Sequence, residues 1–212
     1  LEDDPYGELY FEGQPLSPLK SMDKNGYVMY LSTFSKTISP GLRLGWICTG
    51  KKLIHQLCNI RQLADLHSNC ISQQVVERFI VSGGMADYLT LIRREYKERR
   101  DIMAEALDRY APPGLSWNIP AGGYYLWCTL PEGVSAEALA QKAAAGGVAI
   151  LPGMPSYLVT RKGEAHVRLN YTFPAKNRIS EGIRLLCEAI RELLRLSKEA
   201  AWPAENEINP IL

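Results

Sequence analysis

The sequence predicts an α/β protein, and three observations support this fold class. Short stretches rich in aromatic and β-branched residues alternate with longer stretches whose apolar residues recur at helical spacing. Of the 212 residues, 46% are apolar, which is enough for one good core or two modest ones. The chain contains no internal repeat and no low-complexity block. A globular chain of alternating strands and helices is therefore expected.

The first part of the chain alternates strands with helices. Aromatic and β-branched residues predict strands at 26–34 ("GYVMYLSTF") and 42–50 ("LRLGWICTG"). Apolar residues at helical spacing predict a helix at 51–66, and residues 71–81 are expected to continue in helix. The paired glycines of "SGGM" at 82–85 then favour a turn.

The second part begins with a long helix predicted at 86–110, whose charged residues in i,i+4 relation suit an exposed face and whose length suits a connector between domains. An α+β unit is expected to follow. Ser135 and Asn177 are plausible N-caps for its two helices, and two prolines without periodicity predict an irregular tail at 201–212. The elements expected in this unit are strands at 115–119, 122–130, 148–151 and 166–173, and helices at about 136–145 and 178–198.

Composition excludes several classes of function. A formal net charge of +1 provides no general attraction for nucleic acid or an anionic membrane, so this segment alone is not expected to bind DNA. No signal peptide opens the chain, and no apolar run approaches the roughly 20 residues of a spanning helix. The five cysteines form no CxxC pair, and no histidine lies at metal-ligand spacing. We therefore expect a cytoplasmic protein with no metal site, no membrane contact and buried, reduced thiols.

The stretch "YLSTFSKTISPGLRLGW" at 30–46 places Lys36 among hydroxyl side chains, with Arg43 seven positions later. A lysine at a strand end is usually a solvated surface charge. Here "SPG" predicts a tight turn that folds Arg43 back toward Thr33 and Ser35. A guanidinium fork matches phosphate oxygens and hydroxyls donate to them, so these residues indicate a phosphate site beside a lysine amine.

A phosphorylated cofactor that needs a lysine amine is pyridoxal phosphate, whose aldehyde forms a Schiff base with lysine. Its ring nitrogen also needs a carboxylate partner. "EDDPYGEL" offers Asp3 at a strand end, with Tyr6 three residues later as a donor to the phenolic oxygen of the cofactor. The alternative interpretation of Asp3 and Asp4 is a turn or a helix cap.

The order of "DDPYGEL", "STFSKTISPGLRLGW", "PAGGYYLW", "GVAILPG" and "HVRLNYT" resembles the C-terminal part of the fold-type I pyridoxal phosphate enzymes, in the class I/II aminotransferases. The resemblance covers about residues 1–198. It implies that Lys36 is the Schiff-base lysine and the base that moves the proton between the α-carbon and the cofactor. It also implies that Asp3 partners the pyridine nitrogen and that Tyr6 bonds the ring oxygen.

The same resemblance implies that Thr33, Ser35 and Arg43 bind the phosphate, although the first of these is commonly serine. Threonine keeps the hydroxyl, so this departure is mild. Arg168 in "HVRLNYT" matches the arginine that holds the substrate α-carboxylate in a bidentate pair. The alternative for Arg168 is a surface charge on a strand.

The resemblance also implies a domain organisation. Residues 1–84 correspond to the C-terminal part of the cofactor-binding large domain, and residues 85–200 to the connector helix and the small domain. The glycine-containing phosphate loop of the family, its ring-stacking aromatic residue and its asparagine all precede "DDPY". We therefore expect a chain that lacks the N-terminal half, in a protein that forms a homodimer.

Two branches of the family match these residues. One comprises free-standing aminotransferases, for which an amino acid or 2-oxo acid is the substrate. The other comprises MocR-like regulators of the GntR family, in which a winged-helix domain, absent from this chain, binds DNA and the aminotransferase-like domain senses the cofactor or an amine effector. A third alternative is a catalytically silent fragment that mediates only dimerisation.

Overall fold

The computed structural model describes residues 1–158 and 163–205, and these residues form two compact units. The first unit contains Leu1–Glu95 and Ala121–Gly123, and the second contains Tyr96–Pro120 and the chain from Tyr124 onward. The boundary falls inside helix α4, Gly84–Tyr110, which corresponds to the predicted connector. The assignment of residues 1–84 and 85–200 to two domains of a larger fold stays a prediction.

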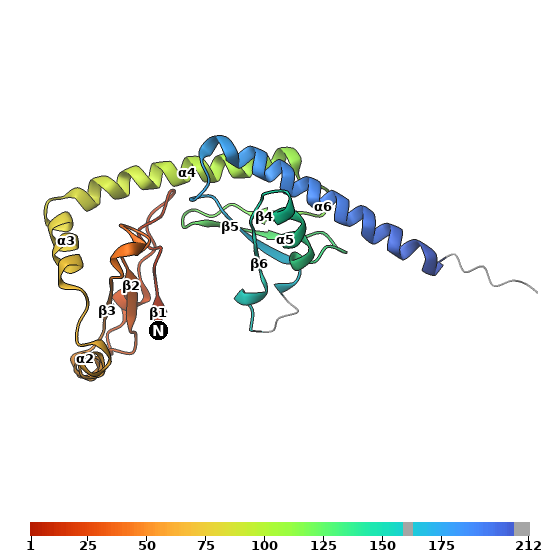
Figure 1. The fold of residues 1–212 in the computed structure, drawn as a ribbon. Coiled ribbons are helices and arrows are strands. Elements are labelled where there is room, and N and C mark those ends of the chain that lie inside the picture. The colour runs from red at the N-terminus through yellow and green to blue at the C-terminus, as the bar shows by residue number, and fades with distance from the viewer. Residues whose placement is uncertain (159–162, 206–212) are drawn as a thin grey trace, which may run out of the picture. The chain divides into compact units, whose positions relative to one another are not determined.

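The first unit contains a three-stranded sheet in the order β1-β2-β3, with β1 parallel and β3 antiparallel to the central strand (Figure 1). Strands β2 and β3 are shorter than the strands predicted at 26–34 and 42–50, because pairing is limited to the residues that face a partner. The strands are β1 (Glu2–Asp3), β2 (Tyr30–Thr33) and β3 (Gly45–Cys48), and the helices before α4 are α1 (Leu19–Met22), the 3-10 turn η1 (Pro40–Leu42), α2 (Lys51–Asp65) and α3 (Cys70–Val81).

The helical stretch predicted from residue 51 onward consists of two helices. Leu66 adopts a positive φ of 66° and ends α2, and the side chain of Asn69 then caps α3 by accepting a hydrogen bond from the backbone N–H of Ser72 at 2.9 Å. The predicted apolar face of α2 is not buried, since no residue of this helix is buried in the structure. Helical periodicity therefore identified the helix but not its packing.

The second unit is built on a four-stranded antiparallel sheet in the order β4-β5-β7-β6. Helices α5 and α6 of this unit pack against each other (Figure 1). The predicted strand at 148–151 is displaced, because pairing begins only at Leu151. The elements are β4 (Ser116–Asn118), β5 (Tyr125–Thr129), α5 (Ala136–Ala145), β6 (Leu151–Pro152), the 3-10 turn η2 (Met154–Ser156), β7 (His166–Asn170) and α6 (Lys176–Glu205).

The two central strands of this sheet have one buried face and one more exposed face. Leu126 and Cys128 of β5 are buried, as are Val167 and Leu169 of β7, and the residues between them are only partly buried or exposed. Burial raises the pKa of Cys128 to about 12, with a smaller contribution from the thiol of Cys187 in α6. The more exposed face of these two strands is the one that can receive a ligand.

Several local predictions can now be compared with the structure. Ser135 caps α5 as predicted, since its hydroxyl accepts a hydrogen bond from the N–H of Ala138 at 3.2 Å. The predicted cap at Asn177 is wrong, because α6 already begins at Lys176. Helix α6 also continues to Glu205, into the tail predicted as irregular from residue 201, while residues 206–212 lie outside the described residues.

The prediction of buried thiols is correct for only two of the five cysteines. All five are free, with Cys128 and Cys187 in the core of the second unit. Cys48, Cys58 and Cys70 are exposed, which corrects the prediction. No helix in the described part of the chain is long and apolar enough to cross a membrane.

Candidate functional site

Lys36 lies in a single helical turn that follows β2. The turn closes through hydrogen bonds from the N–H groups of Ile38 and Ser39 to the carbonyl of Phe34, at 2.8 and 3.0 Å. Lys36 itself is partly buried. A lysine in a short, hydrogen-bonded turn at a strand end has a more restricted backbone than one in an open loop, which suits a residue that must present its amine in one direction.

The two hydroxyls before Lys36 differ in their surroundings. The Thr33 hydroxyl accepts a hydrogen bond from the Ser35 N–H at 3.1 Å and donates to the carbonyl of Leu44 at 2.9 Å. The Ser35 hydroxyl lies 3.0 Å from the Thr33 oxygen. A hydroxyl carries only one hydrogen, so Thr33 braces the turn, and Ser35 is the hydroxyl better able to donate to a ligand.

Arg43 ends η1 in the left-handed region, with φ 52° and ψ 38°, a conformation that non-glycine residues rarely adopt. The next residue, Leu44, returns to the end of β2, where its carbonyl accepts hydrogen bonds from Phe34 and Thr33. The backbone therefore returns to Thr33 at Leu44, whereas the prediction that Arg43 itself folds back toward Thr33 and Ser35 stays a prediction. The guanidinium of Arg43 is exposed and donates to the carbonyl of Pro40 at 3.1 Å.

Asp3 and Asp4 have different surroundings although they are adjacent in sequence. The Asp4 carboxylate accepts a hydrogen bond from the hydroxyl of Tyr30 at 2.8 Å, and burial, followed by this bond, raises the pKa of Tyr30 to about 12. Asp3 pairs with Leu31 in the β1–β2 register and is exposed, and no hydrogen bond or ion pair holds its carboxylate in the described part of the chain. Of the two carboxylates, Asp3 is the one available to a ligand.

The chain turns sharply after these carboxylates. Tyr6 is partly buried, and its carbonyl accepts a hydrogen bond from the N–H of Leu9 at 2.7 Å. Gly7 lies directly against Asp4, because a Cβ atom at position 7 would meet the Asp4 Oδ2 atom at 2.2 Å. A larger residue at position 7 would displace Asp4 and disturb the turn that contains Tyr6.

Arg168 lies in β7 of the second unit, on the more exposed face of the sheet. Its Cζ atom lies 4.1 Å from the centroid of the Tyr125 ring, and its Nε atom is buried without a hydrogen-bond partner. Arg99 and Arg100 of α4 differ, because each donates to backbone carbonyls. Arg168 has no protein acceptor among the described residues, which favours a ligand-binding role.

Two rings on the same sheet, Trp127 and His166, form a stacked cluster with Tyr157, the residue that follows η2. The His166 ring lies 5.5 Å from each of the other two, and the Thr129 hydroxyl lies 3.3 Å from its Nδ1 atom. Trp127 is also the β5 neighbour of Arg168 in the strand register.

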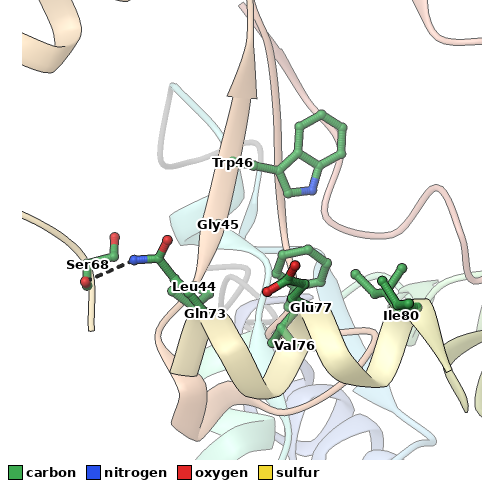
Figure 2. A pocket seen from close by; sticks show the side chains of 10 residues that line it. Leu44, Gly45, Trp46, Ser68, Gln73, Val76, Glu77 and Ile80 are labelled. Atoms are coloured by element: carbon green, nitrogen blue, oxygen red, sulfur yellow. Dashed lines mark hydrogen bonds between the residues drawn. The ribbon is translucent and has the colours of Figure 1, made fainter. Parts of the chain in front are cut away.

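A cavity of the first unit lies between β3 and α3 and has a volume of about 410 Å³. Figure 2 shows Trp46 on one side of it, with Val76, Glu77 and Ile80 of α3 on the other. None of the predicted cofactor residues lines this cavity. A smaller cavity of about 200 Å³ includes Thr33 and Asp4 but not Lys36. We therefore place the candidate site on the Lys36 turn and not in the larger cavity.

The residues of the first unit fit a phosphorylated pyridine cofactor. The Asp3 carboxylate, unpaired among the described residues, lies at the end of β1, and a lysine, a serine hydroxyl and an arginine lie on the turn between β2 and β3. These groups supply an anion for a ring N–H, an amine, and two donors for phosphate. A metal fits less well, because no cluster of three or more His, Cys, Asp or Glu side chains occurs among the residues that the structure describes.

Comparison with known proteins identifies the family. The model of aminotransferase class I and II matches residues 1–189. The chain belongs to this family. It is 40% identical to aromatic-amino-acid aminotransferase 1 of Thermococcus litoralis over 92% of its own length and 46% of that protein. It is also 36% identical to the uncharacterized HTH-type transcriptional regulator YisV of Bacillus subtilis, over 92% of its own length and 40% of that protein.

The aminotransferase fold is confirmed by a solved structure, LysN from Thermus thermophilus, an α-aminoadipate aminotransferase complexed with N-(5'-phosphopyridoxyl)-L-leucine. The TM-score is 0.85 at 36% identity, over 92% of this chain and 50% of that one. The matches indicate pyridoxal phosphate as the cofactor, as the sequence predicts. The chain spans about half the length of the curated relatives it matches.

Sequence reasoning missed two relationships in this aminotransferase-family chain. The pairing of Asp4 with Tyr30 separates the roles of two adjacent aspartates, and the contact of Tyr125 with Arg168 joins residues 43 positions apart. The sequence predicts only a strand at 122–130, with no side assigned to Tyr125. Only the register between β5 and β7 places Tyr125 next to Arg168.

Proposed function

We propose that this chain is the part of an aminotransferase-type protein that holds pyridoxal phosphate through Lys36. The observation that carries the proposal is the turn after β2, in which Lys36 follows the hydroxyl residues Thr33 and Ser35. The left-handed backbone of Arg43 brings the chain back, so that the Thr33 hydroxyl donates a hydrogen bond to the Leu44 carbonyl. Backbone strain of this kind is retained where surrounding structure and function require it. A surface lysine would not need such a turn.

Each residue of the site has a distinct task in this proposal. Pyridoxal phosphate, when bound, supplies an aldehyde and a ring that accepts electrons from the α-carbon of an amino acid. The Asp3 carboxylate holds a proton on the ring nitrogen, and the Tyr6 hydroxyl donates to the ring oxygen. The Nζ atom of Lys36 provides the covalent attachment and accepts or returns the α-proton.

The remaining residues bind the charged ends of the ligands. Ser35 and Arg43 donate to the phosphate, while Thr33 keeps their turn in place. Arg168 binds the α-carboxylate of an amino acid through its guanidinium fork, and the support for this role is that no protein acceptor holds the fork in the described ranges. Family membership and the family resemblance also lead us to propose a cytoplasmic homodimer.

The test of the proposal is chemical labelling of the protein expressed from the complete gene. Borohydride reduction in the presence of pyridoxal phosphate, followed by peptide mapping, should place the label on Lys36. The Lys36→Ala variant should lose the label and transamination, yet retain cofactor through its phosphate and ring contacts. A label on another lysine would refute the assignment.

A regulatory function is the second candidate, and the similarity to YisV over 92% of this chain favours it. In that case Lys36 and Arg168 would sense cofactor and an amine effector or amino acid, and DNA would be bound by a domain outside this chain. The complete gene distinguishes the two candidates: a winged helix before this segment identifies a regulator, and a short N-terminal arm identifies an enzyme.

A further inference from the structure

The guanidinium of Arg168 is held by an aromatic ring and not by an anion. Its Cζ atom lies 4.1 Å from the centroid of the Tyr125 ring, a separation at which a cation is attracted to the negative face of the ring. No hydrogen bond or ion pair joins the guanidinium to a residue in the described ranges, 1–158 and 163–205. The cation–π contact with Tyr125 is therefore the interaction that holds the Arg168 guanidinium among the described residues.

The strand register makes this contact possible. Tyr125 pairs with Asn170 and Trp127 pairs with Arg168, so Tyr125 and Arg168 are diagonal neighbours on one face of the β5–β7 ladder. Diagonal neighbours lie within reach of aromatic and long side chains. Leu151 of β6 is the neighbour of Arg168 on the other side, and it offers no side-chain acceptor.

An aromatic partner has a consequence that an acidic partner would not have. A carboxylate would occupy the N–H donors of the guanidinium, whereas a ring face attracts the charge and leaves these donors available. The ring also restricts a long side chain that would otherwise sample many rotamers. Such a partner is suited to an arginine whose donors must remain available to a ligand.

We propose that Tyr125 is a positioning residue, which orients the Arg168 fork for the carboxylate of an amino-acid ligand. This inference rests on the proposed carboxylate-binding role of Arg168 and adds to it the residue that fixes the geometry. The face of the ring provides the contact, so phenylalanine at this position substitutes for tyrosine and an aliphatic residue does not.

The test is a binding titration with matched ligands, performed on the cofactor-loaded protein from the complete gene. L-Phenylalanine and 2-phenylethylamine form one pair, and L-leucine and isopentylamine form another. Tyr125→Leu should weaken binding of both amino acids about 3- to 30-fold and change binding of the amines less than about twofold. Tyr125→Phe should bind all four ligands like the parent protein.

Tyr124→Leu is the matched control, because this neighbouring ring packs edge-on against Tyr96, at 5.3 Å, and against Tyr125, at 6.0 Å, but is not the ring that covers Arg168. It should leave the ratio of amino-acid to amine affinity unchanged. If Tyr125→Leu does not fold, Tyr125→Met removes the same ring and replaces it in the experiment.

Three results would overturn the positioning role: unchanged amino-acid affinity in Tyr125→Leu, equal losses for amino acids and amines, or a Tyr125→Phe variant as weak as Tyr125→Leu. Arg168→Ala separates this inference from the function on which it rests. If Arg168→Ala weakens binding of amino acids more than binding of amines and Tyr125→Leu does not, only the role of Tyr125 is wrong. If neither variant weakens amino-acid binding more than amine binding, the carboxylate-binding role of Arg168 is wrong as well.

Discussion

The hydroxyl of Thr33 donates a hydrogen bond to the carbonyl of Leu44 over 2.9 Å, which joins the end of β2 to the residue before β3. The turn between them contains Ser35, Lys36 and Arg43. This one bond therefore supports the backbone of three candidate cofactor residues. It also explains why a threonine is acceptable where the family commonly has serine, since either hydroxyl can make it.

The first prediction concerns this brace. Thr33→Val should destabilise the turn by about 1 kcal/mol, because the Ser35 N–H loses its acceptor while the Leu44 carbonyl keeps the hydrogen bond from Phe34. Thermal unfolding measures the change. Thr33→Ser should behave like the parent protein. A Thr33→Val variant with full stability but no cofactor binding would show that Thr33 is a phosphate ligand and not a brace.

The second prediction concerns Arg43. Arg43→Lys should reduce the free energy of cofactor binding by roughly 1 to 3 kcal/mol, because an ammonium cannot reproduce a forked pair with phosphate. Direct titration with pyridoxal phosphate measures this. Unchanged affinity would show that the Arg43 side chain points elsewhere.

Arg43→Gly is the matched variant for the backbone. Glycine adopts φ 52° without strain, so stability should stay within about 1 kcal/mol of the parent while cofactor affinity falls at least as far as in Arg43→Lys. If Arg43→Gly keeps full cofactor affinity, the residue serves the turn and not the phosphate.

The third prediction concerns Arg168. Arg168→Ala should sharply weaken binding of α-amino acids and spare matched amines, because it leaves a carboxylate without its charged partner in a partly desolvated site. In an enzyme the loss is measured as reduced turnover with amino-acid donors. In a regulator it is measured as loss of effector response with DNA binding intact.

Arg99 provides the control for Arg168, because its Nε atom is also buried without a partner but its Nη1 atom donates to the carbonyls of Thr172 and Pro174. Arg99→Ala should lower stability by about 1 to 3 kcal/mol and affect both ligand classes alike. Equal losses of affinity for amino acids and amines in Arg168→Ala would show that Arg168 of β7 does not bind the carboxylate.

The fourth prediction concerns the buried thiol of Cys128. Burial raises its pKa from 9.0 to about 12, so folding favours the neutral thiol. This contribution to stability is complete below pH 9 and is lost as the pH rises toward 12. The free energy of unfolding, measured with urea, should fall between about pH 8 and pH 10 by about 1 kcal/mol more in the parent protein than in Cys128→Ala. Equal losses in the two proteins would contradict the assigned burial.

Alkylation gives an independent measurement of the same feature. At about pH 8, iodoacetamide should leave Cys128 and Cys187 unmodified in the folded protein and modify both after denaturation, because both thiols are buried in the second unit. Mass spectrometry of the peptides identifies the modified sites. Rapid modification of Cys128 in the folded protein would show that the core of this unit opens.

The sequence by itself determined the features that depend on near neighbours in the chain. The alternation of strands and helices, the cap at Ser135 and the turn after Lys36 follow from periodicity and turn chemistry, which act over a few residues. The order of five short motifs was enough to identify the aminotransferase family and its cofactor. Lys36 could be singled out because its neighbours in sequence are also its neighbours in the turn.

Only the tertiary structure decided the features that depend on pairing between distant segments. The β1–β2 pairing and the Tyr30 hydroxyl distinguish Asp3 from Asp4, and the β5–β7 register places Tyr125 on Arg168. The same is true of α2, which has an apolar stripe but buries none of its residues in the described structure. The physical reason is that periodicity fixes which side chains share a face, whereas register and packing fix what that face meets.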